Sequence, residues 1–528
     1  MMQNNRAYPA ADTITGGMDM DMQVIRENIR LEQPLGTGHA VAVVTGEVTL
    51  PGGLREETRV LAATASVSAE SAEANAGRVN VRGRTVFHVL YTQGDPTKIN
   101  AIEASADFVQ PCDLPGVQGR ALAEAAVNVH HVEARASGGR MSLRAEVEVS
   151  ARATSAQPTE AVTGIEGSDN VEVLTHTQEI CRLAASGSKD VLLREELALP
   201  DGLKIRETLF ARAWPVLEAA TGGAGRVGVS GQVLLEAVHA CDLPERPMVV
   251  TRHSIPFAQG VEISGEDGER LSGAVSVRDV AVASQADGEG MTMRAEVLLG
   301  LEARVDTAET LSVLQDAYTT DGDDLRMTSQ QLMCRTGSVQ VTAAETGKAT
   351  LRMPDTAPPV RTVLAAFVQA VPEAREYTTG RMTLSGLMDT TLLYMTDNAD
   401  APVSVRLKEP FRVTFAADVP QDALITLSAT ETEATPITSD RVEMRCILRM
   451  EASGQEQAPL RIASDGQVVP PVEVTGDVVL CYTQAGEGLW DIARRYRVPV
   501  EGVRALNPDL HGEPPAGQGV LVWRRAMR

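Results

Sequence analysis

The sequence predicts a mainly β protein in which three tandem antiparallel β-sandwich-like repeats are followed by a small βααβ module. Two observations carry this prediction. Through most of the chain, apolar residues alternate with polar or small ones, as they do in half-buried strands. Three short patterns also recur in one order about every 150 residues. At 528 residues, 43% of them hydrophobic, the chain is long enough for several folded domains.

The most regular of the recurring patterns is Gly-Arg, apolar, any, apolar, any, Gly. It begins at Gly77, Gly225 and Gly380, with offsets of 148 and 155 residues. A second pattern follows each copy, with offsets of 150 and 151 residues, and a third precedes each; they read MSLRAEV, MTMRAEV and VEMRCIL from Met141, Met291 and Val442, and LPGGL, LPDGL and MPDTA from Leu50, Leu199 and Met353. Chance does not readily place three patterns in one order at one period, so we interpret the chain as three tandem copies of one unit.

Strands are the better prediction than helices within each unit. Residues 63–71 alternate although their alanines would tolerate a helix, and the matching stretch of the third unit holds Pro372, which a helix interior resists. Glycines inside the strand patterns are expected to mark a bulge, a bend or a close backbone approach; they are Gly83, Gly231 and Gly386. The arginines of the repeated pattern are expected to cover strand edges rather than to hold a ligand, because nothing basic clusters around them; they are Arg78, Arg226 and Arg381.

These patterns, and the turn-rich polar stretches between them, divide the chain. We expect a disordered N-terminal tail over 1–21 and a linker over 454–473. The three repeats are expected at 22–155, 172–307 and 320–453, and the C-terminal module at 474–525.

The first and third units resemble the SPOCS domain of SipL-type spore coat morphogenetic proteins. The resemblance rests on VLAATASVSAES, on the glycine-led strand, on an apolar strand that ends in Tyr91 or Tyr394, and on the polar acidic turn after it. A phenylalanine on a later strand completes it: Phe108, Phe257 or Phe411. The second unit departs from the pattern, because EAVHACDLPERP stands where the tyrosine would fall.

The C-terminal stretch changes from period two to helical spacing. Residues 478–484 are expected to form a strand, after which Leu489, Ile492, Ala493 and Tyr496 recur on one side of a short helix. Pro499 ends that helix, and a second one carries Val503 and Leu506 until Asn507-Pro508; GVLVWR then closes the module as another strand.

This βααβ order, with GEGLWDIARRY, NPDL and PAGQ, resembles a LysM module. The resemblance implies a shallow groove for N-acetylglucosamine chains between the loop after the first strand and the loop after the second helix. The groove residues are then Gly486, Glu487, Gly488, Asn507, Pro508, Asp509 and Leu510. Gly488 stands where the family has Thr or Ser, and Glu487 where it usually has Asp. The role of these loops therefore stays open between a glycan, a protein partner and no contact.

Charge separates the module from the rest of the chain. The formal net charge of −23 argues against nucleic acid and anionic membrane as partners. Residues 474–525 hold six acidic residues and six arginines, so the whole excess lies on the repeats. The arginines of the first helix, Arg494, Arg495 and Arg497, lie largely on its polar side, and we expect this face to dock on an acidic protein.

No catalytic or metal constellation emerges. The eight histidines make no metal-ligand spacing, and His130 and His131 would point to opposite faces of a strand. The six cysteines are far apart, without a CxxC pair, so we expect buried free thiols. We therefore expect no enzyme activity, no metal and no cofactor.

The function expected is that of a non-enzymatic assembly protein of the bacterial spore coat, with the repeats as scaffold and the LysM module as docking end. No signal peptide and no membrane helix are evident, which favours assembly in the mother-cell cytoplasm at the forespore surface. The resemblance implies as partner the coat morphogenetic ATPase, or other coat proteins. The alternatives are a peptidoglycan-binding or wall-remodelling protein targeted by its LysM module, and a cytosolic protein unrelated to sporulation.

Overall fold

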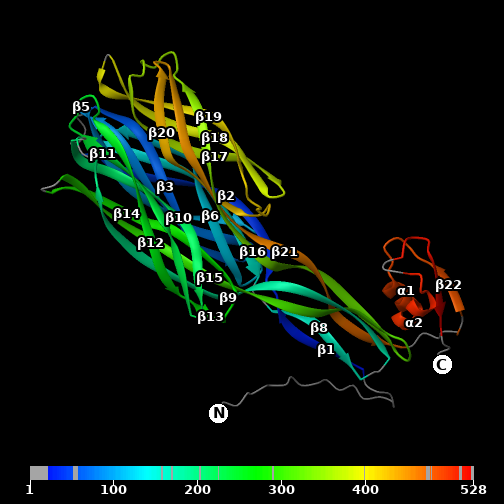
Figure 1. Ribbon diagram of the computed structural model, residues 1–528. Helices are drawn as coiled ribbons and strands as arrows, with labels where there is room; N and C mark the ends of the chain where they lie inside the picture. The colour runs from blue at the N-terminus through cyan, green and yellow to red at the C-terminus, as the bar shows by residue number, and fades with distance from the viewer. Residues whose placement is uncertain are drawn as a thin grey trace, which may run out of the picture.

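A computed structural model describes residues 22–51, 57–155, 158–167, 170–200, 202, 204–223, 225–287, 290–397, 399–470, 476, 478–510 and 514–524. The predicted mainly β class is confirmed: these residues form 23 strands and two short helices. A broad body of sheets narrows into a stem, beyond which lies the small C-terminal segment (Figure 1). The expected tail over 1–21 lies outside the described residues.

Three successive stretches of the chain form pairs of antiparallel sheets with one strand order. In the first pair β2-β7-β6 lies against β3-β4-β5, in the second β9-β15-β14 against β10-β11-β12, and in the third β16-β21-β20 against β17-β18-β19. A two-residue strand, β13 (Ser264–Gly265), also pairs with β9. The first pair comprises β2 (Gln33–Thr49), β3 (Thr58–Asn75), β4 (Arg78–Gln93), β5 (Asp95–Asp113), β6 (Ala121–Ser137) and β7 (Arg140–Ser155).

The other two pairs follow the same plan with longer first and last strands. The second comprises β9 (Val171–Ala198), β10 (Ile205–Gly223), β11 (Arg226–Cys241), β12 (Met248–Glu262), β14 (Arg270–Asp287) and β15 (Gly290–Thr319). The third comprises β16 (Asp324–Arg352), β17 (Thr362–Thr378), β18 (Arg381–Thr396), β19 (Ala399–Phe415), β20 (Leu424–Thr438) and β21 (Arg441–Val469). Edge strands of facing sheets also touch in each pair: β3 and β6, β10 and β14, and β17 and β20.

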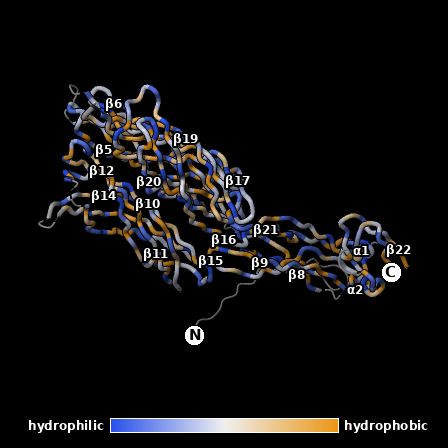
Figure 2. Tube along the Cα trace, turned by 45° about the horizontal axis from the view of Figure 1, so that its top comes forward, coloured by the Kyte–Doolittle hydropathy of each residue, from blue (hydrophilic) through white to orange (hydrophobic). Residues whose placement is uncertain are grey.

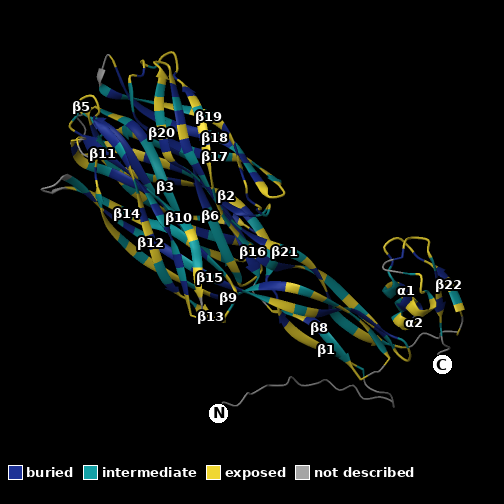
Figure 3. Cartoon of the chain, viewed as in Figure 1, coloured by how far each residue is buried: buried dark blue, intermediate teal, exposed yellow. Residues whose placement is uncertain are grey.

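Each sheet pair encloses its own apolar core. Along β4 the side chains alternate in burial, so that Val79, Val81 and Phe87 face inward, while exposed residues point out (Figure 3). The same alternation of apolar and polar residues follows the strands of all three pairs (Figure 2). Burial of one such side chain stabilises the fold by about 1.5–3 kcal/mol, which explains how cores with few aromatic residues hold together.

The three glycines inside strands serve one structural purpose. Gly83, Gly231 and Gly386 each lie opposite a phenylalanine of the next strand, namely Phe108, Phe257 and Phe411. On the other side, the register shifts at a bulge: between Ala69 and Ser71, between Leu217 and Ala219, and between Pro372 and Ala374. A Cβ at Gly386 would lie 2.0 Å from the carbonyl oxygen of Val371, so the expected close approach is confirmed. Arg78, Arg226 and Arg381 are exposed at the first positions of β4, β11 and β18, which are the central strands of their sheets.

The stem consists of three ribbons, one contributed by each stretch of chain. The first is β1 (Gln23–Arg30) paired with β8 (Pro158–Glu166), and the other two are the outer parts of β9 with β15 and of β16 with β21. Side chains from all three ribbons meet in its core, among them Ile29, Val313 and Leu460. The stem therefore joins the start and end of all three stretches.

The stem corrects two sequence-based boundaries. The linker expected over 454–473 is wrong for residues 454–469, which continue β21 and pair with β16. Likewise β15 runs to Thr319, past the expected limit at 307. The polar, turn-rich composition of these stretches reflects narrow ribbons with one solvent-facing side, which need fewer apolar residues than a sheet between two layers.

Buried charges join the three stretches where the stem meets the body, which we call the neck. The guanidinium of Arg335 donates to Glu32 over 2.7 Å and to Asp306, and all three side chains are buried. Glu32 precedes β2, Asp306 lies on β15 and Arg335 on β16, so each stretch supplies one member. Glu32 also accepts the backbone N–H of Leu183, at 2.7 Å, and Ser338 donates to Asp306, at 2.9 Å. Register shifts at Val305/Asp306 and Arg335/Gly337 direct these side chains inward.

A second contact common to all three stretches is apolar. Leu61 and Leu90 of the first, Phe210 and Val238 of the second, and Phe367 of the third belong to one buried cluster. The rings of Phe210 and Phe367 lie 6.4 Å apart. This cluster and the neck both hold side chains of all three stretches in contact, and they join the three sheet pairs into one body.

Candidate functional site

The C-terminal segment has the predicted element order. It comprises β22 (Val478–Tyr482), α1 (Leu489–Tyr496), α2 (Val500–Leu506) and β23 (Gly519–Trp523), with β22 and β23 antiparallel. Ile492, Ala493, Val503, Val520 and Val522 fill its core. Of the two apolar residues predicted on the second helix, Val503 is buried and Leu506 is exposed.

The inner side of this segment lies against the tip of the stem. Asp316 on β15 accepts hydrogen bonds from the indole of Trp490, at 2.9 Å, and from the guanidinium of Arg494, at 2.6 Å. Tyr318 packs edge-on against Trp490, with ring centroids 5.0 Å apart, and donates to the carbonyl of Val498 over 2.8 Å. Burial raises the pKa of Tyr318, helped by the charges of Glu172 and Asp316, so its hydroxyl remains a donor.

Arg497 makes the most extensive contact between the segment and the stem. It ends α1 in the left-handed conformation, with φ 51°, and its guanidinium enters the turn between β15 and β16. There it donates to the carbonyl and hydroxyl of Thr319, at 3.0 and 2.6 Å, and to the carbonyl of Gly322, at 2.9 Å. A guanidinium has five N–H donors in a planar fork, which suits it to bind several turn carbonyls at once.

The arginines of the first helix are therefore engaged within the chain. The sequence predicted an acidic protein as the partner of this face; within the chain, Arg494 forms an ion pair with Asp316 of the stem. Arg495 forms an ion pair with Glu487 of its own segment. Sequence reasoning missed Asp316, Tyr318 and Thr319, because no local pattern links them to a segment more than 170 residues away.

In the first predicted groove loop, two of the three residues make hydrogen bonds within the segment. Glu487 is buried and accepts the backbone N–H of Gln484 over 2.9 Å. The N–H of Gly488, which precedes α1, donates to Asp491 over 2.9 Å. Gly486 is exposed and occupies a turn with φ 78°.

In the second predicted loop, two residues contact the rest of the segment and two are exposed to solvent. Asn507 bridges α2 to β23: its amide donates to the carbonyls of Val503 and Leu521, both at 2.7 Å, and its oxygen accepts the N–H of Leu521. Leu510 packs on the segment core. Pro508 and Asp509 are exposed. Of the seven predicted residues, Gly486, Pro508 and Asp509 are thus the ones turned most fully to solvent.

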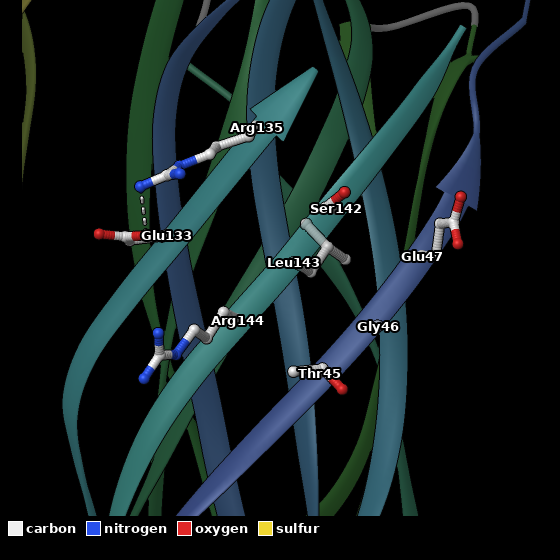
Figure 4. A pocket seen from close by; sticks show the side chains of 8 residues that line it. All are labelled: Thr45, Gly46, Glu47, Glu133, Arg135, Ser142, Leu143 and Arg144. Carbon is white, nitrogen blue, oxygen red and sulfur yellow. Dashed lines mark hydrogen bonds and ion pairs between the residues drawn. The ribbon is translucent and has the colours of Figure 1, made fainter. Parts of the chain in front are cut away.

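Two of the hollows among the described residues of the body are lined by charged side chains. One, of about 490 Å³, is on the outer face of β2, β6 and β7, where Arg135 and Glu133 form an ion pair of 3.2 Å (Figure 4). The other, of about 790 Å³, lies between the three sheet pairs and is lined by residues of each, including Arg152, Arg212 and Arg335. These arginines are paired with Glu124, Glu236 and the neck carboxylates, so the charges of this cavity are largely balanced.

Within the described residues, no group of three or more His, Cys, Asp or Glu side chains is placed to hold a metal ion. His130 and His131 contact different carboxylates, Glu148 and Glu133. All six cysteines are free and buried, as expected, and burial raises the pKa of the Cys446 thiol to about 11. No helix in the part of the chain that the structure describes is long and apolar enough to span a membrane.

Comparison with known families gives one match. Residues 58–137 match the family model of the SipL, SPOCS domain, which covers β3 to β6 of the first sheet pair. No curated protein and no solved structure matches the chain. The family match indicates a sporulation-related protein.

Proposed function

We propose that this protein is a non-enzymatic assembly protein of the bacterial spore coat. The three sheet pairs are three SPOCS-like repeats that serve as a scaffold, and the C-terminal segment is a LysM module that serves as docking end. It acts in the mother-cell cytoplasm, at the forespore surface, and its partner is the coat morphogenetic ATPase or another coat protein. The family match over 58–137 supports the sporulation context.

One observation carries the scaffold part of this proposal: buried charged and apolar side chains from all three stretches join the body and the stem. The neck and the shared apolar cluster join the three stretches of the chain, and Arg497 attaches the module to the end of the stem. A rigid body with a small module at its narrow end suits a protein that spans a distance between two partners.

Fluorescent tagging of the full chain in sporulating cells tests the proposal. A shell of fluorescence around the forespore is the expected result, and a diffuse signal in all cells would contradict it. The same fusion without residues 474–528 then locates the docking function. Loss of the shell assigns docking to the module, whereas an intact shell assigns it to the repeats.

A peptidoglycan-binding protein is the second candidate, favoured by the exposure of Gly486, Pro508 and Asp509 in the predicted groove loops. Its test is a pull-down of the purified full chain with insoluble peptidoglycan. Retention that is lost in Asp509→Ala but kept in Asp190→Ala, an exposed acid of the body, would support this function. An unbound chain would contradict it, and solubilisation of the peptidoglycan would indicate a hydrolase.

A further inference from the structure

The sheet of the C-terminal segment is apolar on both of its faces. One face, with Cys481, Val520 and Val522, covers the core of the segment. The other, which we call the outer face, consists of Val478, Leu480, Tyr482, Leu521 and Trp523. A strand with one solvated face normally alternates apolar with polar residues, so an outer face of this composition indicates a surface that is covered in use.

The outer face is the densest exposed apolar region among the described residues. Its five side chains are between 42% and 69% exposed. Together with the neighbouring Leu506, they account for six of the fifteen large apolar side chains that are exposed in the described chain. Singly scattered apolar residues are ordinary on protein surfaces, whereas a contiguous group marks an interaction site.

The strand pairing also forms the outer face before any partner arrives. Val478 lies opposite Trp523, Leu480 opposite Leu521, and Tyr482 opposite Gly519. Because Gly519 has no side chain, Leu480 and Tyr482 lean over it, within 3.4 and 3.7 Å of where its Cβ would be. Tyrosine and tryptophan are the residue types that contribute most at the centres of protein interfaces.

We propose that the outer face binds the outer face of a second copy of this chain, giving a tail-to-tail dimer. The size of the face favours this: roughly 500 Å² of apolar side chain per copy, about 1,000 Å² in total, reaches the lower limit for a specific interface. Two such sheets would pack face to face about 10 Å apart, as in a β-sandwich. A face that binds its own copy forms a closed twofold interface and does not propagate into a filament.

The distribution of charge favours the same occupant. Residues 474–525 carry no net charge, while the remainder carries the whole excess of −23. Two copies therefore meet at their uncharged ends, and the stem keeps the acidic bodies apart, which minimises their repulsion. In both views β22 lies farther from the stem than α1, so the outer face points away from the chain's own body (Figures 1 and 2).

Sedimentation velocity of the purified full chain tests the proposal. Concentrations between about 1 and 100 µM cover the dissociation constants expected of an interface of this size. The expected result is a concentration-dependent shift from 56.2 kDa towards twice that mass. The double variant Leu480→Thr/Trp523→Thr should raise the dissociation constant at least about 100-fold, because four large apolar side chains leave the interface. Both positions are exposed strand sites, so threonine should leave the fold intact, which near-UV circular dichroism checks.

A matched control separates this face from apolar exposure in general. Val41→Thr/Val109→Thr removes two exposed valines of the body and should leave dimerisation unchanged. Leu480→Cys should form a disulfide-linked dimer on mild oxidation, since the face meets its own copy, while Val109→Cys should not. The dimer should also persist at about 0.5 M salt, because apolar burial rather than charge holds it.

Three results would overturn the proposal. A chain that stays monomeric at the highest concentration means that a different protein covers the face. A dimer that survives the double variant uses another surface. A chain that dimerises only after removal of residues 1–21 means that its own N-terminal segment covers the face. Because the experiment needs only purified protein, its failure leaves the proposed role at the spore coat untouched.

Discussion

The neck and the tip of the stem both rely on an arginine that crosses between distant parts of the chain, but they use it differently. At the neck, Arg335 lies between two buried carboxylates from two other stretches. At the tip, Arg497 donates to a hydroxyl and to backbone carbonyls of a turn, and its ion pair with the partly exposed Asp324 is longer, at 3.7 Å. The neck joins three long stretches that each form their own pair of sheets, whereas the tip holds the small C-terminal segment on one surface.

This difference decides whether the C-terminal segment can detach without unfolding of the body. Breaking the neck leaves Glu32 and Asp306 buried without a counter-charge, which penalises the whole body. Detachment of the segment returns the turn carbonyls to water and strands no buried carboxylate in the body, so the segment can leave while the body stays folded. The neck should therefore govern global stability and the tip local attachment.

Replacement of Arg335 by methionine is expected to have the largest effect. It should lower the free energy of unfolding by about 3–5 kcal/mol, because two carboxylates remain buried and unpaired. Urea denaturation, followed by circular dichroism, measures the loss. Arg84→Met, which removes an exposed ion pair with Asp107, is the control and should leave the midpoint unchanged. An equal response of the two variants would contradict the role of the neck.

Replacement of Arg497 by alanine comes next, with a local effect. The attachment of the segment should weaken by about 2–3 kcal/mol as several charge-assisted hydrogen bonds are lost. Fluorescence of Trp490, which packs on Tyr318, should then change at low denaturant while the β-sheet signal persists. Arg504→Ala, on the exposed side of α2, is the matched control. A single joint transition of both signals would argue against separability.

Glu451 offers a smaller test of what a half-buried carboxylate without an ion pair costs. It lies on β21 beside the central cavity, and among the ion pairs of the described residues none involves it. Burial raises its pKa from 4.5 to about 7. Since the folded state holds this proton more tightly, stability falls as pH rises from about 4.5 through about 7. Glu451→Gln should remove that fall, and gain about 1–3 kcal/mol over the natural protein at pH 8. Parallel stability curves would contradict this assignment.

Local sequence patterns were sufficient for much of the body and of the C-terminal segment. Gly83 inside a strand pattern correctly indicated a close approach, and the spacing of Leu489, Ile492 and Ala493 correctly placed a helix. Both predictions rest on the spacing of apolar and polar residues along a short stretch of chain. A sequence displays such spacing directly.

The stem and its contacts could not be predicted in the same way. Residues 454–469 look like a linker because their ribbon has a solvated side, and nothing in their own composition names β16 as partner. Pairs such as Glu32 with Arg335 and Asp316 with Arg494 join positions far apart in the chain. Their chemistry is ordinary, and only the topology brings them together.

Native-state hydrogen exchange tests most directly the central claim, that a permanently joined body carries a separately attached segment. Peptides covering α1 should exchange through an opening of lower free energy than peptides covering residues 297–305 of β15 above the neck. Arg497→Ala should speed exchange in α1 and leave the β15 peptides unchanged. Exchange of both regions at one free energy, with both accelerated by that substitution, would contradict the claim.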